Sequence, residues 1–385
     1  MDKSITRREW RNVLIWAGAL MALTTLPYVA CAAAQNDTWT FGGSVLGVTD
    51  GNSYLAKMRQ GARDEWLFHI VYTAEPHEGA LFFLPYILLG KVAALFADPH
   101  SPAIVNAMVA IFHTARVIFG TLLVVMTYRF AAAYLRGSAA RMAATMLITA
   151  GGGLGWLLTL LEMGDWLGSQ PIDFFVPEGY TFLILYALPH MALARSLMLG
   201  GLLLTFKNTR RWPARALGAG LCWAGMGLCV PFYIGVLYVV LGGWGLGVWA
   251  RRRRFPSELF WRCIVGAAVA APVLAYSAYH FTSNKVFAVW SSQNMLPSPH
   301  PLHYVFGYGV LAVPAAWGIV WAWRRADRGE RHMLLVTWVV AAPLLVYLPI
   351  NVQRRLAEGV FVSLGVLAVA GLRGTVAPWL ARRLG

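Results

Sequence analysis

Long apolar segments recur along the whole chain and constrain its fold more than any other feature. They run for about 17 to 25 residues, the length of helix that crosses the hydrocarbon core of a bilayer. Of the 385 residues, 58% are hydrophobic and only 13% are charged, whereas soluble domains carry about a quarter charged residues. The alternating polar and apolar strands of a membrane barrel are not visible in the sequence. We therefore expect an all-α polytopic membrane protein.

Basic residues indicate how these segments are oriented. Lys and Arg gather in cytoplasmic loops because their translocation is disfavoured. The first eleven residues carry four Lys and Arg, and further basic clusters lie at residues 129–141, 207–215, 251–262, 323–331 and 373–383. We interpret the net charge of +15 as this topological signal and not as a sign of nucleic-acid binding. We expect a multi-pass protein of the cell inner (plasma) membrane with both termini in the cytoplasm.

An alternation that keeps every basic cluster inside requires about ten spanning helices in a single transmembrane domain, residues 1–385. The predicted spans are 12–34, 104–134, 142–161, 190–206, 216–231, 233–249, 262–281, 304–322, 333–349 and 357–372. The first outer loop is then 35–103 and the second is 162–189. The apolar segment 80–97 would invert everything after it if it spanned, so we expect a juxtamembrane helix there.

Most of the 17 Asp and Glu residues fall on the predicted outer side, as a functional surface or as solvated loops. Asp50, in TDGNSYLAKMRQG, opens a segment in which Tyr54, Leu55 and Met58 share one helical face. A carboxylate at a helix start caps free backbone N–H groups. A carboxylate at the membrane surface is also a candidate general base. Spacing alone favours the cap.

The first third of the chain combines several features in a fixed order. After the first helix, Asp50 and Tyr54 open an amphipathic helix, followed by Gly61, Trp66 and the polar turn EPHEG. Then come LFFLPYILLGKVAALF and a helix that ends in TYRFAAAYLRGSAAR. This order, over roughly residues 10–141, resembles the first-loop region of the GT-C superfamily of membrane glycosyltransferases. That group includes protein O-mannosyltransferases and lipid A aminoarabinose transferases.

The resemblance implies an enzyme that moves a sugar from a polyprenyl-phosphate-type donor to an acceptor on the outer face. In that superfamily the catalytic acid lies near the start of the first juxtamembrane helix, and Asp50 occupies that position here. Many members carry an adjacent second acid. Gly51 and Asn52 follow Asp50 instead, so the resemblance does not imply a metal site with paired carboxylates, and the cofactor stays open.

Tyr54 and other polar residues of the two outer loops are candidates for binding substrate. Glu75, His77 and Glu78 are the next candidates for the base and, with His69, offer ligands that suit several divalent ions. A solvated, hydrogen-bonded turn is the alternative interpretation. His190 lies at a predicted helix start, behind a segment with the look of a re-entrant loop.

Four arginines are candidates for binding phosphate. Arg116 and Arg195 lie inside predicted spans, where a charge usually faces a cavity or a partner. Arg195 is near enough to the helix start to reach the outer headgroups instead. Arg354 and Arg355 form an outer pair that opposes the charge rule, and guanidinium groups bind phosphate oxygens bidentately. A membrane transporter or lipid flippase without transferase activity is the alternative function, although the repeated halves common in transporters are not apparent.

Overall fold

The chain folds into helices and the connections between them. The computed structural model describes residues 5–206, 209–326 and 329–376. Within these ranges the extended pairing is limited to two isolated bridges, Asn36–Trp39 and Phe68–Ala80. The expectation of an all-helical chain is confirmed.

The first half of the chain carries three long helices of the bundle and the short helices of the two long loops. These are α1 (Arg7–Ala33), α2 (Val48–Ala62), α3 (Leu84–Ala93), α4 (Ala103–Tyr134), α5 (Ser138–Ala150), α6 (Gly155–Leu160), η1 (Trp166–Gly168), α7 (Ile172–Phe175), α8 (Thr181–Ala187) and α9 (Pro189–Thr205).

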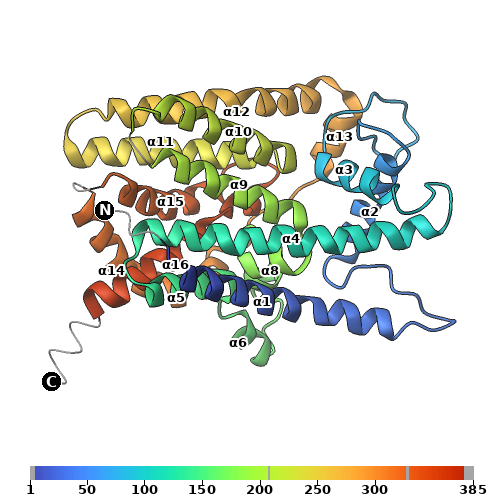
Figure 1. Cartoon of the computed structure of the whole chain (residues 1–385), viewed down its shortest axis with the longest axis horizontal. Coiled ribbons are helices and arrows are strands. Elements are labelled where there is room, and N and C mark those ends of the chain that lie inside the picture. Colours follow the sequence, from blue (N-terminus) through green and yellow to red (C-terminus); the bar gives the residue numbers. More distant parts are fainter. Residues whose placement is uncertain (1–4, 207–208, 327–328, 377–385) are drawn as a thin grey trace.

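The second half consists mainly of helices that run along the bundle (Figure 1). These are α10 (Trp212–Cys229), α11 (Tyr233–Arg252), α12 (Ser257–Ser283), α13 (Lys285–Gln293), α14 (Pro301–Arg325), α15 (Arg331–Leu345), η2 (Gln353–Ala357), α16 (Val360–Gly371) and η3 (Leu372–Val376).

Six segments of the described chain are long and apolar enough to cross a membrane. They are α1, α4, α11, α12, α14 and the run Gln353–Gly374, which joins η2, α16 and part of η3. A bilayer core requires about 20 residues of helix, and each of these segments meets that length. The protein is therefore a multi-pass helical membrane protein.

A helix lies in each of the ten ranges predicted to span, but one of the ten is interrupted. The predicted continuous span 142–161 is wrong, because α5 ends at Ala150 and α6 begins at Gly155. Between them the Gly153 backbone packs against Gly307 of α14 so closely that a Cβ atom would lie 2.5 Å from the Gly307 oxygen. Asp173 accepts hydrogen bonds from the N–H groups of Gly153 and Gly155, which holds the interrupted backbone in place.

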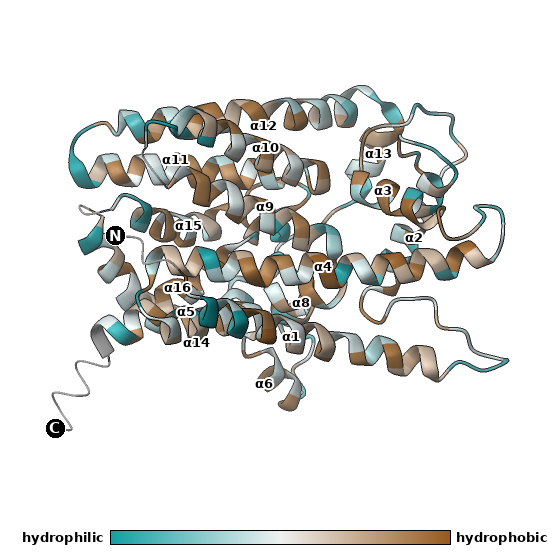
Figure 2. Ribbon diagram, viewed as in Figure 1, coloured by the Kyte–Doolittle hydropathy of each residue, from teal (hydrophilic) through white to brown (hydrophobic). Residues whose placement is uncertain are grey.

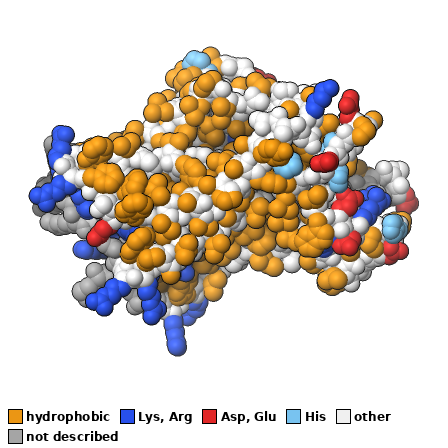
Figure 3. Space-filling model, turned by 90° about the horizontal axis from the view of Figure 1, so that it is seen from above, with side chains coloured by type: hydrophobic (Ala, Val, Ile, Leu, Met, Phe, Trp, Pro, Cys, Tyr) orange, Lys and Arg blue, Asp and Glu red, His pale blue; other side chains and the backbone are white. Residues whose placement is uncertain are grey.

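Charge and hydropathy are distributed unequally along the bundle. The start of α1 and the end of α16 lie towards one end, whereas α2, α3 and α13 lie at the other (Figure 1). Apolar residues occupy the middle of the helices (Figure 2). On the face shown in Figure 3, most Lys and Arg gather at one end and most Asp, Glu and His at the other. We call these the basic end and the loop end.

The short helices of the loop end are fixed by close backbone packing. The helices α2 and α3 cross where Gly61 faces the carbonyl of Ile87 and Gly90 faces the carbonyl of Met58. A Cβ atom at either glycine would lie 2.0 Å or less from those oxygens, so only glycine permits this approach. The helix α3 has ten residues and is too short to cross a bilayer. Its length agrees with the juxtamembrane helix expected within 80–97.

Candidate functional site

The carboxylate of Asp50 projects from the first turn of α2 at the loop end. The helix begins after Gly47, which adopts a left-handed conformation with φ of 62°, and no side chain caps it. The interpretation of Asp50 as the N-cap is therefore wrong, because the cap position lies three residues earlier. Asp50 is exposed, and its charge acts on Tyr54 and Lys57 of the same helix and on Arg354.

Three stacked aromatic rings, those of Tyr54, Tyr86 and Phe112, lie near Asp50, and we call them the floor of the candidate site. Tyr54 stacks on Tyr86 of α3 with ring centroids 4.5 Å apart, and Tyr86 stacks on Phe112 of α4 at 6.2 Å. Burial, followed by the charge of Asp50, raises the pKa of Tyr54 above its usual range. Tyr54 therefore stays a neutral hydroxyl that serves as a hydrogen-bond partner and not as an anion.

His190 joins this floor from the start of α9. Its ring lies 5.2 Å from the Tyr54 ring, and its Nδ1 lies 2.5 Å from the Tyr86 hydroxyl. The Tyr86–His190 contact ties the first outer loop to the bundle. If Tyr86 donates its proton, the imidazole proton is on Nε2, and His190 then presents a donor on its other edge.

Lys57 is a site residue that the sequence reasoning did not select. Its side chain is buried, its Nζ donates to the Ser53 hydroxyl at 2.6 Å, and it lies 4.1 Å from the ring centre of Phe83. Burial lowers the pKa of Lys57 to about 8, against the opposing effect of Asp50. Two signals in the sequence could have found it: Lys57 is a basic residue of the predicted outer loop, and it lies two turns after Asp50, which places both residues on the same face of one helix.

Arg354 and Arg355 lie in η2. The Arg354 guanidinium lies 4.8 Å from the ring centre of Phe175, and Arg355 lies 5.9 Å from that of Phe232. The charge of Arg355 acts on both Tyr54 and His190. Each of the five residues Asp50, Tyr54, His190, Arg354 and Arg355, which come from three distant parts of the sequence, thus lies within electrostatic range of at least one other member of the set.

Glu75, His77 and Glu78, the remaining candidates of the first loop, lie in a turn that is held by hydrogen bonds to its own backbone. The Nε2 of His77 accepts a hydrogen bond from the N–H of Ile70 at 2.9 Å, and its Nδ1 lies 2.9 Å from the carbonyl oxygen of Glu75. The carbonyl of Glu78 accepts from Asn284, while the carboxylates of Glu75 and Glu78 are exposed. Across the described ranges, no group of three His, Cys, Asp or Glu residues is placed to hold a metal ion.

Arg116 is fully buried among neutral groups of α1, α4 and α8. Its guanidinium donates to the hydroxyls of Thr24 and Thr25 and to the carbonyl of Leu185, and it lies 4.8 Å from the Tyr28 ring centre. His113, one turn earlier, lies 2.9 Å from the carbonyl oxygen of Gly43 through its Nε2. Arg116 thus connects α1, α4 and α8, and none of these contacts involves Asp50.

Arg195 does not extend to the membrane surface, as the sequence allowed. It is fully buried and binds the carboxylate of Glu358 through two hydrogen bonds. It also donates to the carbonyl oxygen of Glu178 at 2.6 Å. Arg195 therefore fixes the second outer loop to the segment before α16.

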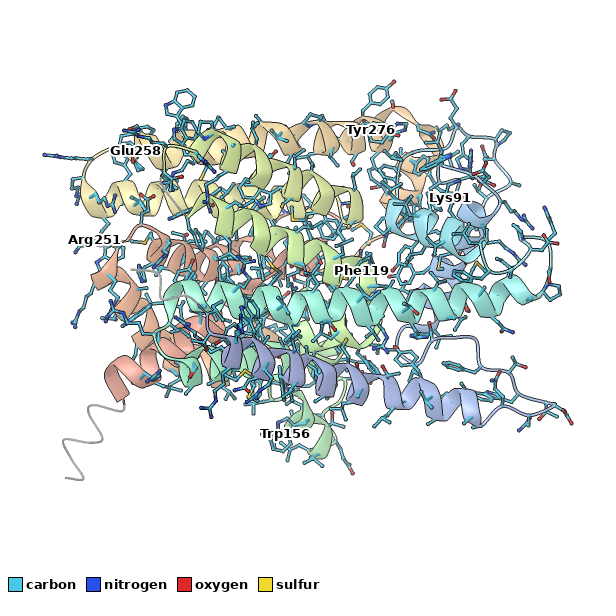
Figure 4. All side chains as sticks on the ribbon, in the orientation of Figure 1. Lys91, Phe119, Trp156, Arg251, Glu258 and Tyr276 are labelled. Carbon is cyan, nitrogen blue, oxygen red and sulfur yellow. The ribbon has the colours of Figure 1, made fainter. Side chains whose placement is uncertain are left out.

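An apolar groove with a volume of about 170 Å³ lies between the second half of α12 and the end of α10. The residues that line it are Leu81, Gly227, Leu228, Pro231, Pro272, Val273, Tyr276 and Ser277. Tyr276, labelled in Figure 4, accepts a hydrogen bond from the N–H of Leu81, so the outer loop closes one side. Pro231, which lines the groove, directly precedes Phe232, whose ring centre lies 5.9 Å from the Arg355 guanidinium.

Comparisons with known proteins add no relative to this picture. No family model matches the chain, and neither the curated proteins nor the solved structures contain a match.

Proposed function

We propose that the protein is a membrane glycosyltransferase that moves a sugar from a polyprenyl-phosphate-type donor to an acceptor hydroxyl or amine at the loop end. One observation carries the proposal. An exposed carboxylate, Asp50, acts electrostatically on Lys57 and Arg354, and Arg355 acts on the neighbouring Tyr54. This supplies a proton acceptor and several cations within one site, beside an apolar groove.

Asp50 and the cations have complementary roles in this reaction. The acceptor oxygen or nitrogen forms a bond to the anomeric carbon of the sugar and gives its proton to the Asp50 carboxylate. The bond from that carbon to the phosphate oxygen breaks, and the phosphate keeps the electron pair. Lys57, Arg354 and Arg355 stabilise the charge that develops there, because cations fixed in a poorly hydrated site cost little reorganisation.

The groove suits the lipid part of the donor. Its lining is mainly apolar and includes Pro231 and Pro272. A dry apolar cavity of about 150 Å³ holds a molecule the size of benzene, so the groove takes one short, branched piece of a lipid chain. The remaining chain would lie among the membrane lipids, and the phosphate would lie towards Phe232 and Arg355.

A lipid flippase is the second candidate, favoured by the helix interruption after α5 and by the buried charge of Arg116. The two functions differ in their product. We would reconstitute the protein in vesicles with a radiolabelled polyprenyl-phosphate sugar and a mixture of acceptors. Transfer predicts free polyprenyl phosphate and labelled product, and both require Asp50. Movement of intact donor across the bilayer without cleavage would support the flippase and overturn the proposal.

A further inference from the structure

Glu178, between α7 and α8, is a buried carboxylate beside the candidate site. It is 3% exposed, and its Oε1 lies 3.5 Å from the Nε of Arg355. The Arg355 side chain itself is 37% exposed. A buried anion thus faces one edge of a guanidinium that is still open to ligands.

The backbone of Glu178 is fixed by the ion pair behind it. Its carbonyl oxygen accepts from Arg195 at 2.6 Å and from the N–H of Gly359 at 3.3 Å. Arg195 is held in turn by both carboxylate oxygens of Glu358. The carboxylate of Glu178 therefore extends from a backbone held by several hydrogen bonds, and Arg355 is the more exposed partner.

The edge of Arg355 that meets Glu178 determines which donors are left. A guanidinium has five N–H donors, one on Nε and four on the two Nη atoms. The ion pair uses the Nε edge, so the two Nη groups are available to a second partner. The charge of Arg355 acts on Tyr54 and His190, the residues that form the floor beside Asp50.

We infer that Glu178 is a positioning residue that orients Arg355 so that its Nη groups bind the phosphate of a lipid headgroup in the site. The inference rests on the proposed function for the identity of the donor. The orienting contact itself serves any lipid phosphate, whether on a polyprenyl chain or on an ordinary anionic phospholipid. A residue that orients a binding side chain matters because that side chain binds well only when its donors point at the ligand.

Charged groups on several elements act on the Glu178 carboxylate. Burial raises the pKa of Glu178, while Arg355 opposes the shift. Glu358 adds to the increase and Arg195 counteracts it. Tyr54, Tyr233, Tyr304 and Tyr308 also lie within range of its charge. Arg354 of η2 is also within range of the Glu178 charge, but Arg355 is the cation that forms the ion pair with it. That contact, at 3.5 Å, is longer than the 2.6 and 2.7 Å hydrogen bonds between Arg195 and Glu358.

The test measures binding by the full chain in phosphatidylcholine nanodiscs that contain either polyprenyl phosphate or phosphatidylglycerol. Glu178→Gln should weaken lipid-phosphate binding about tenfold, the scale of losing one hydrogen bond to a charged group. Arg355→Ala should weaken binding at least as much, and the double variant should be no weaker than Arg355→Ala. Glu162→Gln removes the same charge from an exposed position in the same loop and should change nothing.

Two outcomes would contradict the inference. Tighter binding by Glu178→Gln would mean that Glu178 competes with the ligand for Arg355, and an effect that persists in the Arg355→Ala background would mean that Glu178 acts elsewhere. Either result overturns it. If Glu178→Gln does not fold, Glu178→Asp takes its place. Its shorter side chain keeps the charge but moves the carboxylate away from Arg355, and we again expect weaker binding only when Arg355 is present. If wild type prefers neither lipid, the proposed donor is wrong, while the coupling is still measured with phosphatidylglycerol.

Discussion

Arg195 and Glu358 form an ion pair without any exposed surface, 163 positions apart in the sequence. The Nε and Nη2 atoms of Arg195 lie 2.6 and 2.7 Å from the two carboxylate oxygens of Glu358. Trp338 donates to the Glu358 carbonyl, and Thr181 accepts from Arg195. This network joins α8, α9, α15 and the segment before α16. Two of these elements adjoin candidate residues, since α9 carries His190 and the segment before α16 follows Arg354 and Arg355.

We expect removal of either partner to destabilise the protein strongly. Glu358→Gln leaves the Arg195 charge buried without compensation, which costs about 3–5 kcal/mol. The measurement is thermal unfolding in detergent. Replacing both partners, as Arg195→Met with Glu358→Leu, should restore part of the loss because no buried charge remains. Asp64→Asn breaks an ion pair whose carboxylate is 92% exposed and should leave the melting temperature nearly unchanged.

Asp50→Asn should separate catalysis from folding. Asp50 is exposed and makes no capping hydrogen bond, so the melting temperature should stay within a degree or two of wild type, as is usual for surface substitutions. Sugar transfer should fall by at least about 100-fold, the lower range for loss of a general base. Asp37→Asn, an exposed acid of the same loop, should keep full activity. Normal turnover in a folded Asp50→Asn protein would exclude Asp50 as the base.

Local sequence patterns predicted most of the helices and part of the site. Hydropathy located a helix in every predicted span because each helix must bury apolar residues over its own length, independent of its neighbours. Asp50 and Tyr54 lie one turn apart in α2, and a sequence pattern can show such a neighbour relation within one helix. The grouping of His190, Arg354 and Arg355 with them stays a prediction, because no sequence pattern shows which residues of distant segments touch.

The parts that sequence reasoning missed depend on tertiary partners. The interruption after α5 arises from contacts with Asp173 and Gly307, which lie 20 and more residues away. The burial of Lys57 depends on Phe83 of the connection before α3. The pairing of Arg195 with Glu358 crosses almost half of the chain. Hydropathy averages over a window cannot register such contacts.

The position of α3 predicts which side of the membrane its flanks occupy. If α3 lies at the surface, cysteines in place of Glu78 and Asp98, both exposed, should react with an impermeant thiol reagent from the same side in intact cells. A cysteine at Arg253, in the basic connection after α11, should react only after permeabilisation. Labelling of only one of the two loop positions would show that the segment between them spans. We avoid Gly79, where a Cβ atom would lie 2.7 Å from the His69 ring.

The lowered pKa of Lys57 predicts a pH dependence for binding of a lipid phosphate. Below pH 8 the amine is charged and attracts the phosphate, and above its pKa of about 8 the free protein loses that charge. The phosphate monoester is already mostly a dianion at pH 7, because its second pKa is about 6. The affinity for polyprenyl phosphate should therefore be highest between about pH 7 and 8 and fall by up to about tenfold per pH unit above the pKa of Lys57. Unfolding is not the cause, because a lysine with a lowered pKa in the folded state favours folding as the pH rises above 8.

Two lysine-to-arginine variants make this test specific to Lys57. Lys57→Arg keeps a charge that does not titrate in this range, so the decline above pH 8 should disappear if the variant folds. Lys91→Arg alters the exposed pair with Asp64 and should keep the wild-type profile. A wild-type affinity that does not change between pH 7 and 9.5, or a decline that survives in Lys57→Arg, would remove Lys57 from the phosphate site. Arg354 and Arg355 would then be its only remaining cations among the residues proposed for that role.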